Sequence, residues 1–177
     1  MKIFRLLLCF VFIFAVSAFV FGQNGKARAQ NFRAVSMSGE TVELDALKGK
    51  IVVLTFWSTR CGICHESIPK LNRMAKNYQG ENVVFLALTM ENQAKVANYL
   101  KKTQFDFKIL PNTFDVVLKY GAKNNGGNSG YIEMPFPAHF LINQKGEIEM
   151  KASGFSKTAQ LDSEINRLLH SKQTKAE

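Results

Sequence analysis

The sequence contains few of the residues that bind metal ions. Its 177 residues include only three cysteines and three histidines. Beyond Cys61 and Cys64 there is no second pair at the spacing of a four-ligand zinc site, so we expect no metal centre. The chain also has no internal repeat and no basic run interleaved with aromatic residues, which argues against a solenoid and against nucleic-acid binding.

Acidic residues are also scarce. Fourteen Asp and Glu residues stand against 23 Lys and Arg residues, which gives a formal net charge of +9. Because the lysines are scattered along the chain, we interpret this excess as a solvated basic surface. The chain is 46% hydrophobic and 21% charged, which is typical of one compact domain with a short extension.

The longest apolar run lies at the N-terminus. Lys2 and Arg5 precede residues 6–21, an apolar segment that is interrupted only by Ser17 and is typical of an export signal. It is shorter than the roughly 20 residues of a membrane-spanning helix, but a retained membrane anchor is the alternative. We therefore expect the protein in the periplasm or at the extracytoplasmic face of a membrane. The predicted parts are a signal peptide or anchor, a tether, a folded domain and a frayed tail: 1–22, 23–30, 31–170 and 171–177.

The domain alternates between strand-like and helix-like patterns. Apolar runs and alternation predict strands, at 41–44, 51–57, 83–88, 105–110, 138–143 and 147–153. Apolar residues at helical spacing predict helices, from the cysteine pair to residue 78 and at 92–102, 113–120 and 158–170. This alternation predicts an α/β fold, and the antiparallel hairpin near its end makes the sheet mixed.

Two cysteines carry the predicted chemistry. Cys9 lies within the leader, so the exported chain retains only Cys61 and Cys64. A bridge over two intervening residues constrains the unfolded chain little, so redox chemistry explains the pair better than stabilisation does. At a helix N-terminus, unpaired amides and the helix dipole favour a thiolate. We therefore predict Cys61 as the nucleophile and Cys64 as the cysteine that attacks the mixed disulfide and releases the partner.

The cysteine pair and the next residue also spell Cys-x-x-Cys-His, the attachment motif of c-type haem. Haem would require thioether bonds from both cysteines, His65 as an axial ligand and a distant sixth ligand. A hydrophobic strand leads directly into the motif, and the rest of the chain is α/β, so we favour sulfur exchange. A c-type cytochrome remains the alternative.

Several stretches resemble a known family. Residues 55–64, TFWSTRCGIC, resemble the active site of the thioredoxin superfamily. The wider frame, from 32 to 169, resembles the exported TlpA/ResA-type thiol-disulfide oxidoreductases. It includes the hairpin before Gly49, Pro69 in the helix after the cysteines, and FPAHFLIN at 136–143.

This resemblance implies a thioredoxin-like three-layer fold, with a mixed central β-sheet flanked by helices and an N-terminal β-hairpin. It also implies that Pro137 is a cis-proline facing the cysteines, and we assign substrate binding to Trp57, Phe136 and Pro137. The redox-active disulfide Cys61-Cys64 would need no cofactor. Its partners would be protein thiols or disulfides and an upstream electron donor in the membrane.

Four positions depart from the family pattern, and one of them is Ala138, where Thr is usual after the proline. Arg60 stands where Trp is common, and Thr55 stands where relatives carry Asp or Asn. Exported relatives often have Glu at the position of Ser67, whereas this chain has Glu66 one residue earlier. We therefore name Arg60, Thr55 and Glu66 as candidates for tuning the pKa of Cys61. The sequence assigns no role to His139, a strand residue near the proline.

The sequence therefore predicts an exported thiol-disulfide oxidoreductase that acts on protein disulfides. Gly62 and Ile63 supply neither charge nor an imidazole to the sulfur, which favours a reductant over a strong oxidant. Besides the cytochrome, the remaining alternative is a non-catalytic thioredoxin-like binding module.

Overall fold

The structure, a computed structural model of the chain, describes residues 26–121 and 134–171. The predicted leader, the first residues of the tether and most of the tail lie outside the described residues. Within the part of the chain that is described, no helix is long and apolar enough to cross a membrane.

A five-stranded sheet forms the centre of the domain, with the strand order β5-β4-β3-β6-β7. Its strands are β3 (Ile51–Phe56), β4 (Val83–Leu88), β5 (Lys108–Leu110), β6 (Ala138–Ile142) and β7 (Ile148–Ser153). β3 and β4 pair in parallel, as do β4 and β5, whereas β6 is antiparallel to both β3 and β7. The sheet is therefore mixed, as the sequence predicts.

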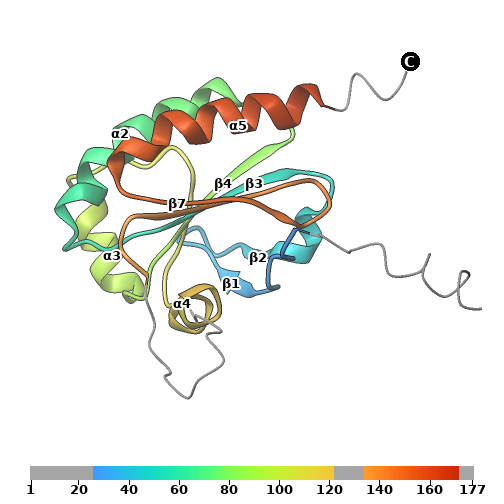
Figure 1. The fold of residues 1–177 in the computed structure, drawn as a ribbon. Coiled ribbons are helices and arrows are strands. Elements are labelled where there is room, and N and C mark those ends of the chain that lie inside the picture. The colour runs from blue at the N-terminus through green and yellow to red at the C-terminus, as the bar shows by residue number, and fades with distance from the viewer. Residues whose placement is uncertain (1–25, 122–133, 172–177) are drawn as a thin grey trace, which may run out of the picture.

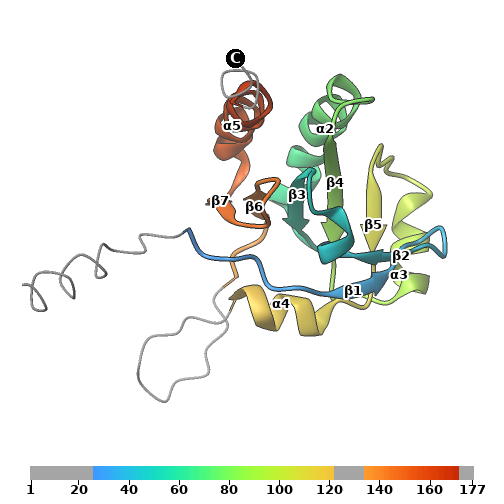
Figure 2. The same ribbon diagram turned by 90° about the vertical axis from the view of Figure 1, so that its right-hand side faces the viewer.

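Helices and a small second sheet cover the two faces of the central sheet. Helices α2 (Gly62–Asn77) and α5 (Thr158–His170) lie side by side over one face (Figures 1 and 2). Helix α4 (Phe114–Gly121) and the antiparallel pair β1 (Arg33–Val35) and β2 (Thr41–Glu43) cover the other face. Helix α3 (Gln93–Leu100) and two 3-10 turns, Leu44–Leu47 and Phe155–Lys157, complete the order. This is the predicted thioredoxin-like arrangement with an N-terminal hairpin.

The central strand β3 is buried along its whole length. All six of its residues are buried. Side chains alternate between the faces of a strand, so Ile51 and Val53 pack beneath α2 and α5, whereas Val52 and Leu54 pack toward α4 and the small sheet. The apolar run without alternation therefore predicts this strand correctly.

Two elements differ from the sequence prediction, the strand at 105–110 and the helix predicted at 113–120, which spans Phe114–Gly121 in the structure. The strand predicted at 105–110 is shorter, because Phe105 and Phe107 turn their rings into an aromatic cluster with Trp57 and Phe85. At the start of α4, the Thr113 hydroxyl donates a hydrogen bond to the Thr89 carbonyl oxygen at 3.0 Å. Thr113 therefore ties the helix to the end of β4.

Residues 26–30, which the sequence assigns to a tether, form a strap along the β6-β7 hairpin. The Ala29 amide donates to the Gly146 carbonyl at 2.9 Å, and the Ile148 amide donates to the Ala27 carbonyl at 2.8 Å. The Tyr120 hydroxyl donates a hydrogen bond to the Gln30 carbonyl oxygen at 2.9 Å. Because this hairpin turn lies beside Val52, at the start of β3, the strap is bound at the end of the sheet opposite to the cysteines.

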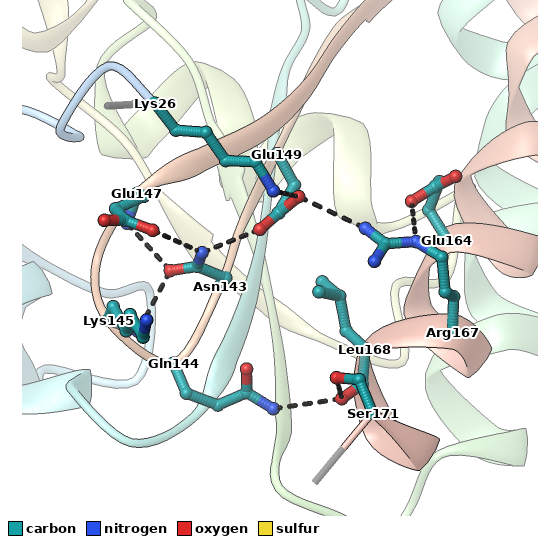
Figure 3. Close-up of polar contacts among 10 residues, drawn as sticks. All are labelled: Lys26, Asn143, Gln144, Lys145, Glu147, Glu149, Glu164, Arg167, Leu168 and Ser171. Atoms are coloured by element: carbon teal, nitrogen blue, oxygen red, sulfur yellow. Dashed lines mark hydrogen bonds and ion pairs between the residues drawn. The ribbon is translucent and has the colours of Figure 1, made fainter. Parts of the chain in front are cut away.

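The buried carboxylate of Glu149 connects the strap to the hairpin and to α5. Its side chain is 5% exposed, and it contacts Lys26 of the strap, Arg167 of α5 and the Asn143 amide, as Figure 3 shows. Burial raises the pKa of Glu149, but the hydrogen bonds and charges of these partners outweigh burial and hold the pKa below its ordinary value. The strap, the hairpin and α5 are therefore joined at one ionised group.

We predict that the strap contributes to the stability of the domain. Deleting residues 1–30 removes the three hydrogen bonds that Ala29, Ala27 and Gln30 make, whereas deleting residues 1–25 keeps them. Each bond contributes about 0.5 to 1.5 kcal/mol, so the longer deletion should lower the free energy of unfolding by about 1.5 to 4.5 kcal/mol more than the shorter one. Urea unfolding of the two proteins measures the difference.

The control is Lys26→Gln in the protein that begins at residue 26. The Lys26 side chain is half-exposed, so this change should cost less than about 1 kcal/mol. Equal stability of the two deletion proteins would show that the domain begins at residue 31.

Candidate functional site

The two cysteines lie where the central strand meets the first long helix. Cys61 is the N-cap of α2, and its sulfur is bonded to that of Cys64. The Cys64 amide also donates to the Cys61 Sγ at 3.2 Å. Cys61 is partly exposed and Cys64 is 1% exposed. Cys61 is therefore the more accessible of the two cysteines.

This geometry fits sulfur exchange and does not fit thioether bonds to haem. An anion at Cys61 would meet an amide N-H and the positive end of the helix dipole. A haem needs both sulfurs to be accessible to its vinyl groups, but Cys64 is 1% exposed. The His65 Nε2 lies 3.0 Å from the Thr59 carbonyl oxygen, and the His65 ring lies beside the Tyr99 ring at a tilt of 38°.

A single carboxylate holds the loop that precedes the cysteines. Glu91 follows β4 and accepts hydrogen bonds from the Thr59 amide at 2.8 Å, the Thr59 hydroxyl at 2.8 Å and the Ser58 hydroxyl at 3.1 Å. Lys95, one turn into α3, pairs with the same carboxylate at 2.9 Å. The end of β4 thus fixes the loop that leads into Cys61.

Glu91 remains ionised in this environment. Its side chain is 11% exposed, and burial alone raises the pKa of a carboxyl group. Hydrogen bonds from Lys95, Thr59 and Ser58 outweigh burial and lower the pKa of Glu91 from 4.5 to about 2. The Glu91 carboxylate is therefore fully charged at neutral pH.

Of the residues assigned to substrate binding, Trp57 and Phe136 belong to the cluster of side chains that contains both cysteines. The Phe136-Pro137 peptide bond is cis. Phe136 is partly exposed and packs against the cluster that contains both cysteines and Trp57. Trp57 is 1% exposed, which places its indole in the packing beneath the dithiol and away from the surface that meets a partner. Two exposed apolar side chains are Ile63, between the cysteines, and Met90, the residue before Glu91, at 50% and 41% exposure.

The three tuning candidates are not brought together. Arg60 is exposed, and its amide donates to the Ser58 hydroxyl at 3.2 Å. Glu66 is exposed on α2, while its neighbour Ser67 is buried and donates to the Ile63 carbonyl at 2.9 Å. Thr55 is buried in β3.

Sequence reasoning misses two residues at the site. Local pattern marks Glu91 only as a residue before a helix, although an acidic residue directly after a buried parallel strand lies at the edge where the cysteines lie. His139 has no role by sequence, yet it is 0% exposed and its Nδ1 lies 3.1 Å from the Thr55 Oγ1. A histidine in an otherwise apolar strand is the available signal.

No group of three or more His, Cys, Asp or Glu side chains that could hold a metal ion occurs within residues 26–121 and 134–171.

Comparison with known proteins gives consistent matches. The model of the AhpC/TSA family matches residues 26–151. A thiol-disulfide oxidoreductase ResA of Bacillus cereus is 33% identical over 147 residues, which cover 82% of this chain and 79% of that protein. ResA of Bacillus subtilis (strain 168) is 30% identical over 127 residues, 71% of this chain and 65% of that protein.

Solved structures share the fold. A thiol:disulfide interchange protein of the thioredoxin family from Chlorobium tepidum TLS superposes with a TM-score of 0.69 at 21% identity, and the match covers 84% of this chain and 99% of that chain. StoA from Bacillus subtilis superposes with a TM-score of 0.61 at 23% identity, over 77% of this chain and 97% of that chain.

We predict that Glu91→Gln destabilises the domain at neutral pH. The neutral amide loses the charge-assisted bonds from Lys95 and Thr59, so unfolding should become easier by about 1 to 3 kcal/mol at pH 7. The folded-state pKa is lowered, so this stabilisation is complete above pH 4.5 and is lost as the pH falls toward 2. Urea unfolding between pH 3 and 7 tests this, and the difference between the two proteins should shrink with acid.

Glu66→Gln is the matched control, because Glu66 is an exposed glutamate on α2. Its effect should stay within about 0.5 kcal/mol at each pH. A loss from Glu91→Gln that is as large at pH 3 as at pH 7 would contradict the role of the ionised carboxylate.

Proposed function

This chain belongs to the AhpC/TSA family and is a thioredoxin-like thiol-disulfide oxidoreductase, and we propose that it reduces disulfides of other proteins outside the cytoplasm. The observation that carries the proposal is the unequal exposure of two bonded cysteines at the start of a helix, with Cys61 open and Cys64 buried.

This geometry supports the roles that we propose for the two sulfurs. In the dithiol form, Cys61 at the helix N-terminus attacks a disulfide of the partner protein, and a mixed disulfide forms. Cys64 then attacks the Cys61 sulfur, closes the intramolecular disulfide and releases the partner as a dithiol. The Cα atoms of the two cysteines are 5.2 Å apart, within the range that disulfides require, so closure needs no large backbone movement.

The direction of electron flow is inferred from the surroundings of Cys61. Gly62 and Ile63 are exposed and bring no charge to the sulfur, and the Arg60 side chain is exposed to solvent. A cysteine stabilised only by the helix N-terminus favours a moderate potential, which suits a reductant.

Export and partners belong to the same proposal. The apolar N-terminal segment would carry the chain out of the cytoplasm or hold it to a membrane. A reductant in an oxidising compartment must itself be reduced, so it requires an upstream dithiol donor, which we place in the membrane. Its own chemistry uses the Cys61-Cys64 pair without a further cofactor.

We predict different outcomes for the two cysteine variants. Cys61→Ser should abolish reduction of insulin disulfides by the reduced protein, because the exposed nucleophile is lost. Cys64→Ser should still allow attack but should accumulate a mixed disulfide, since nothing releases the partner. Insulin turbidity and non-reducing electrophoresis measure the two outcomes.

Three results would contradict the proposal. Mixed disulfides that form through Cys64 when Cys61 is absent would reverse the assigned roles. Wild-type protein that binds insulin without reducing it would indicate a non-catalytic module. A covalent haem spectrum of the natively exported protein would restore the cytochrome alternative.

A further inference from the structure

His139 and Thr55 form a buried polar pair in the middle of the sheet. The two residues face each other across the β3-β6 ladder, and the Nδ1 of His139 lies 3.1 Å from the Thr55 hydroxyl. The other ring nitrogen of His139, Nε2, is buried and has no hydrogen-bond partner among the described residues. A buried nitrogen without a partner is costly, so its presence calls for an explanation.

The pair lies on the face of the sheet that α2 covers. Thr55 follows Ile51 and Val53 on one face of β3, and His139 shares a face of β6 with Leu141. Ile51, Val53 and Leu141 belong to the core cluster formed with α2 and α5. His139 and Thr55 therefore point into the space beneath these helices.

Cys64 reaches the same level of the sheet from α2. On its other side, Thr55 pairs with Ala87 of β4. Ala87 is 0% exposed and belongs to the buried cluster that contains Cys64 and Trp57. The row Ala87, Thr55 and His139 thus runs across the sheet from the cluster that contains the resolving cysteine to the buried imidazole.

The imidazole is neutral in the disulfide state. Burial lowers the pKa of His139 to about 4, and burial is the only cause of the shift. The other titratable side chains of the covering helices are at least partly exposed, and several have partners of their own. These are His65, Glu66, Lys70, Arg73 and Lys76 on α2 and Asp162, Glu164, Arg167 and His170 on α5. Cys64 is the titratable group on α2 that is buried.

We propose that His139, held by Thr55, accepts the proton that Cys64 releases when the dithiol closes to the disulfide. The inference rests on the proposed function, since it concerns the resolving step of that reaction. Thr55 acts as the positioning residue, because its hydroxyl contacts Nδ1 and fixes the ring.

The step balances in atoms and electrons. The Cys64 thiol transfers its proton to Nε2, and its sulfur attacks Cys61 in the mixed disulfide. The Cys61-Cys64 bond forms, the bond between Cys61 and the partner breaks, and the partner sulfur leaves as a thiolate. The Cys61-Cys64 dithiol is oxidised by two electrons and the partner disulfide is reduced. The imidazolium then returns its proton to solvent or to the leaving thiolate.

The physical advantage is the avoidance of an isolated buried charge. Cys64 is 1% exposed, so a lone thiolate at this position would be strongly disfavoured. Transfer of the proton to a nearby imidazole creates a pair of opposite charges in its place. In the dithiol state the thiol also offers the hydrogen-bond partner that Nε2 lacks in the disulfide state.

The test uses the reduced full chain and one equivalent of an aromatic disulfide whose thiolate is coloured on release. The first release reports attack by Cys61, and the second reports resolution by Cys64. In His139→Leu, the second release should be roughly tenfold to hundredfold slower at pH 7, while the first release is unchanged. The defect should diminish toward pH 10, where hydroxide removes the thiol proton.

Two further variants complete the test. Thr55→Val keeps the shape of Thr55 but removes its hydroxyl, so it should slow the second release by a smaller factor. His170→Asn, at the exposed end of α5, should leave both releases unchanged. Equal slowing of both releases, or a second-release defect that is the same at every pH, would overturn the proposal.

Nuclear magnetic resonance of the three histidine rings tests the proposal without mutation. The ring nitrogens of His139 should change their signals when the disulfide is reduced, whereas those of His170 should not. An unchanged His139 ring would overturn the inference even if His139→Leu fails to fold. Because neither measurement uses a protein substrate, a failure to reduce insulin would count only against the proposed function.

Discussion

The burial of β3 on both faces is the constraint on which the rest of the site depends. All six of its residues are buried, so its backbone groups must find their partners in β4 and β6. The chain therefore leaves the sheet only at the end of the strand, and the cysteines lie directly beyond that end. Glu91, at the corresponding end of β4, ties down the connecting loop. The position of Cys61 is thus set by strand pairing and by one carboxylate.

The features that could be predicted from sequence are those that depend on the spacing of apolar residues within a short segment. The apolar run at 51–57 predicts the central strand, and helical spacing places the last helix at residues 158–170, the bounds that it has in the structure. The position of Cys61 at the start of α2 also follows from local order, because a strand ends and a helix begins around it. The α/β class and the mixed sheet then come from the sequence of elements.

The features that could not be predicted depend on contacts between distant segments. Thr55 and His139 are 84 positions apart, and the contact of Glu91 with Ser58 spans 33 positions. The spacing of neighbouring residues indicates neither of these contacts. The strap has the composition of a tether because its polar, basic residues show no strand pattern. Its binding uses backbone groups and Glu149, which composition does not reveal.

The position of the strap bears on how the domain would face a membrane. Residues 26–30 enter the fold beside the β6-β7 turn, at the opposite end of the central strand from the cysteines. If the leader holds the chain to a membrane, the strap connects the leader to the end of the domain that lies opposite to the cysteines. The dithiol would then face outward from the lipid, where it can meet soluble partners, and a donor embedded in the bilayer would have to reach around the domain or extend beyond it.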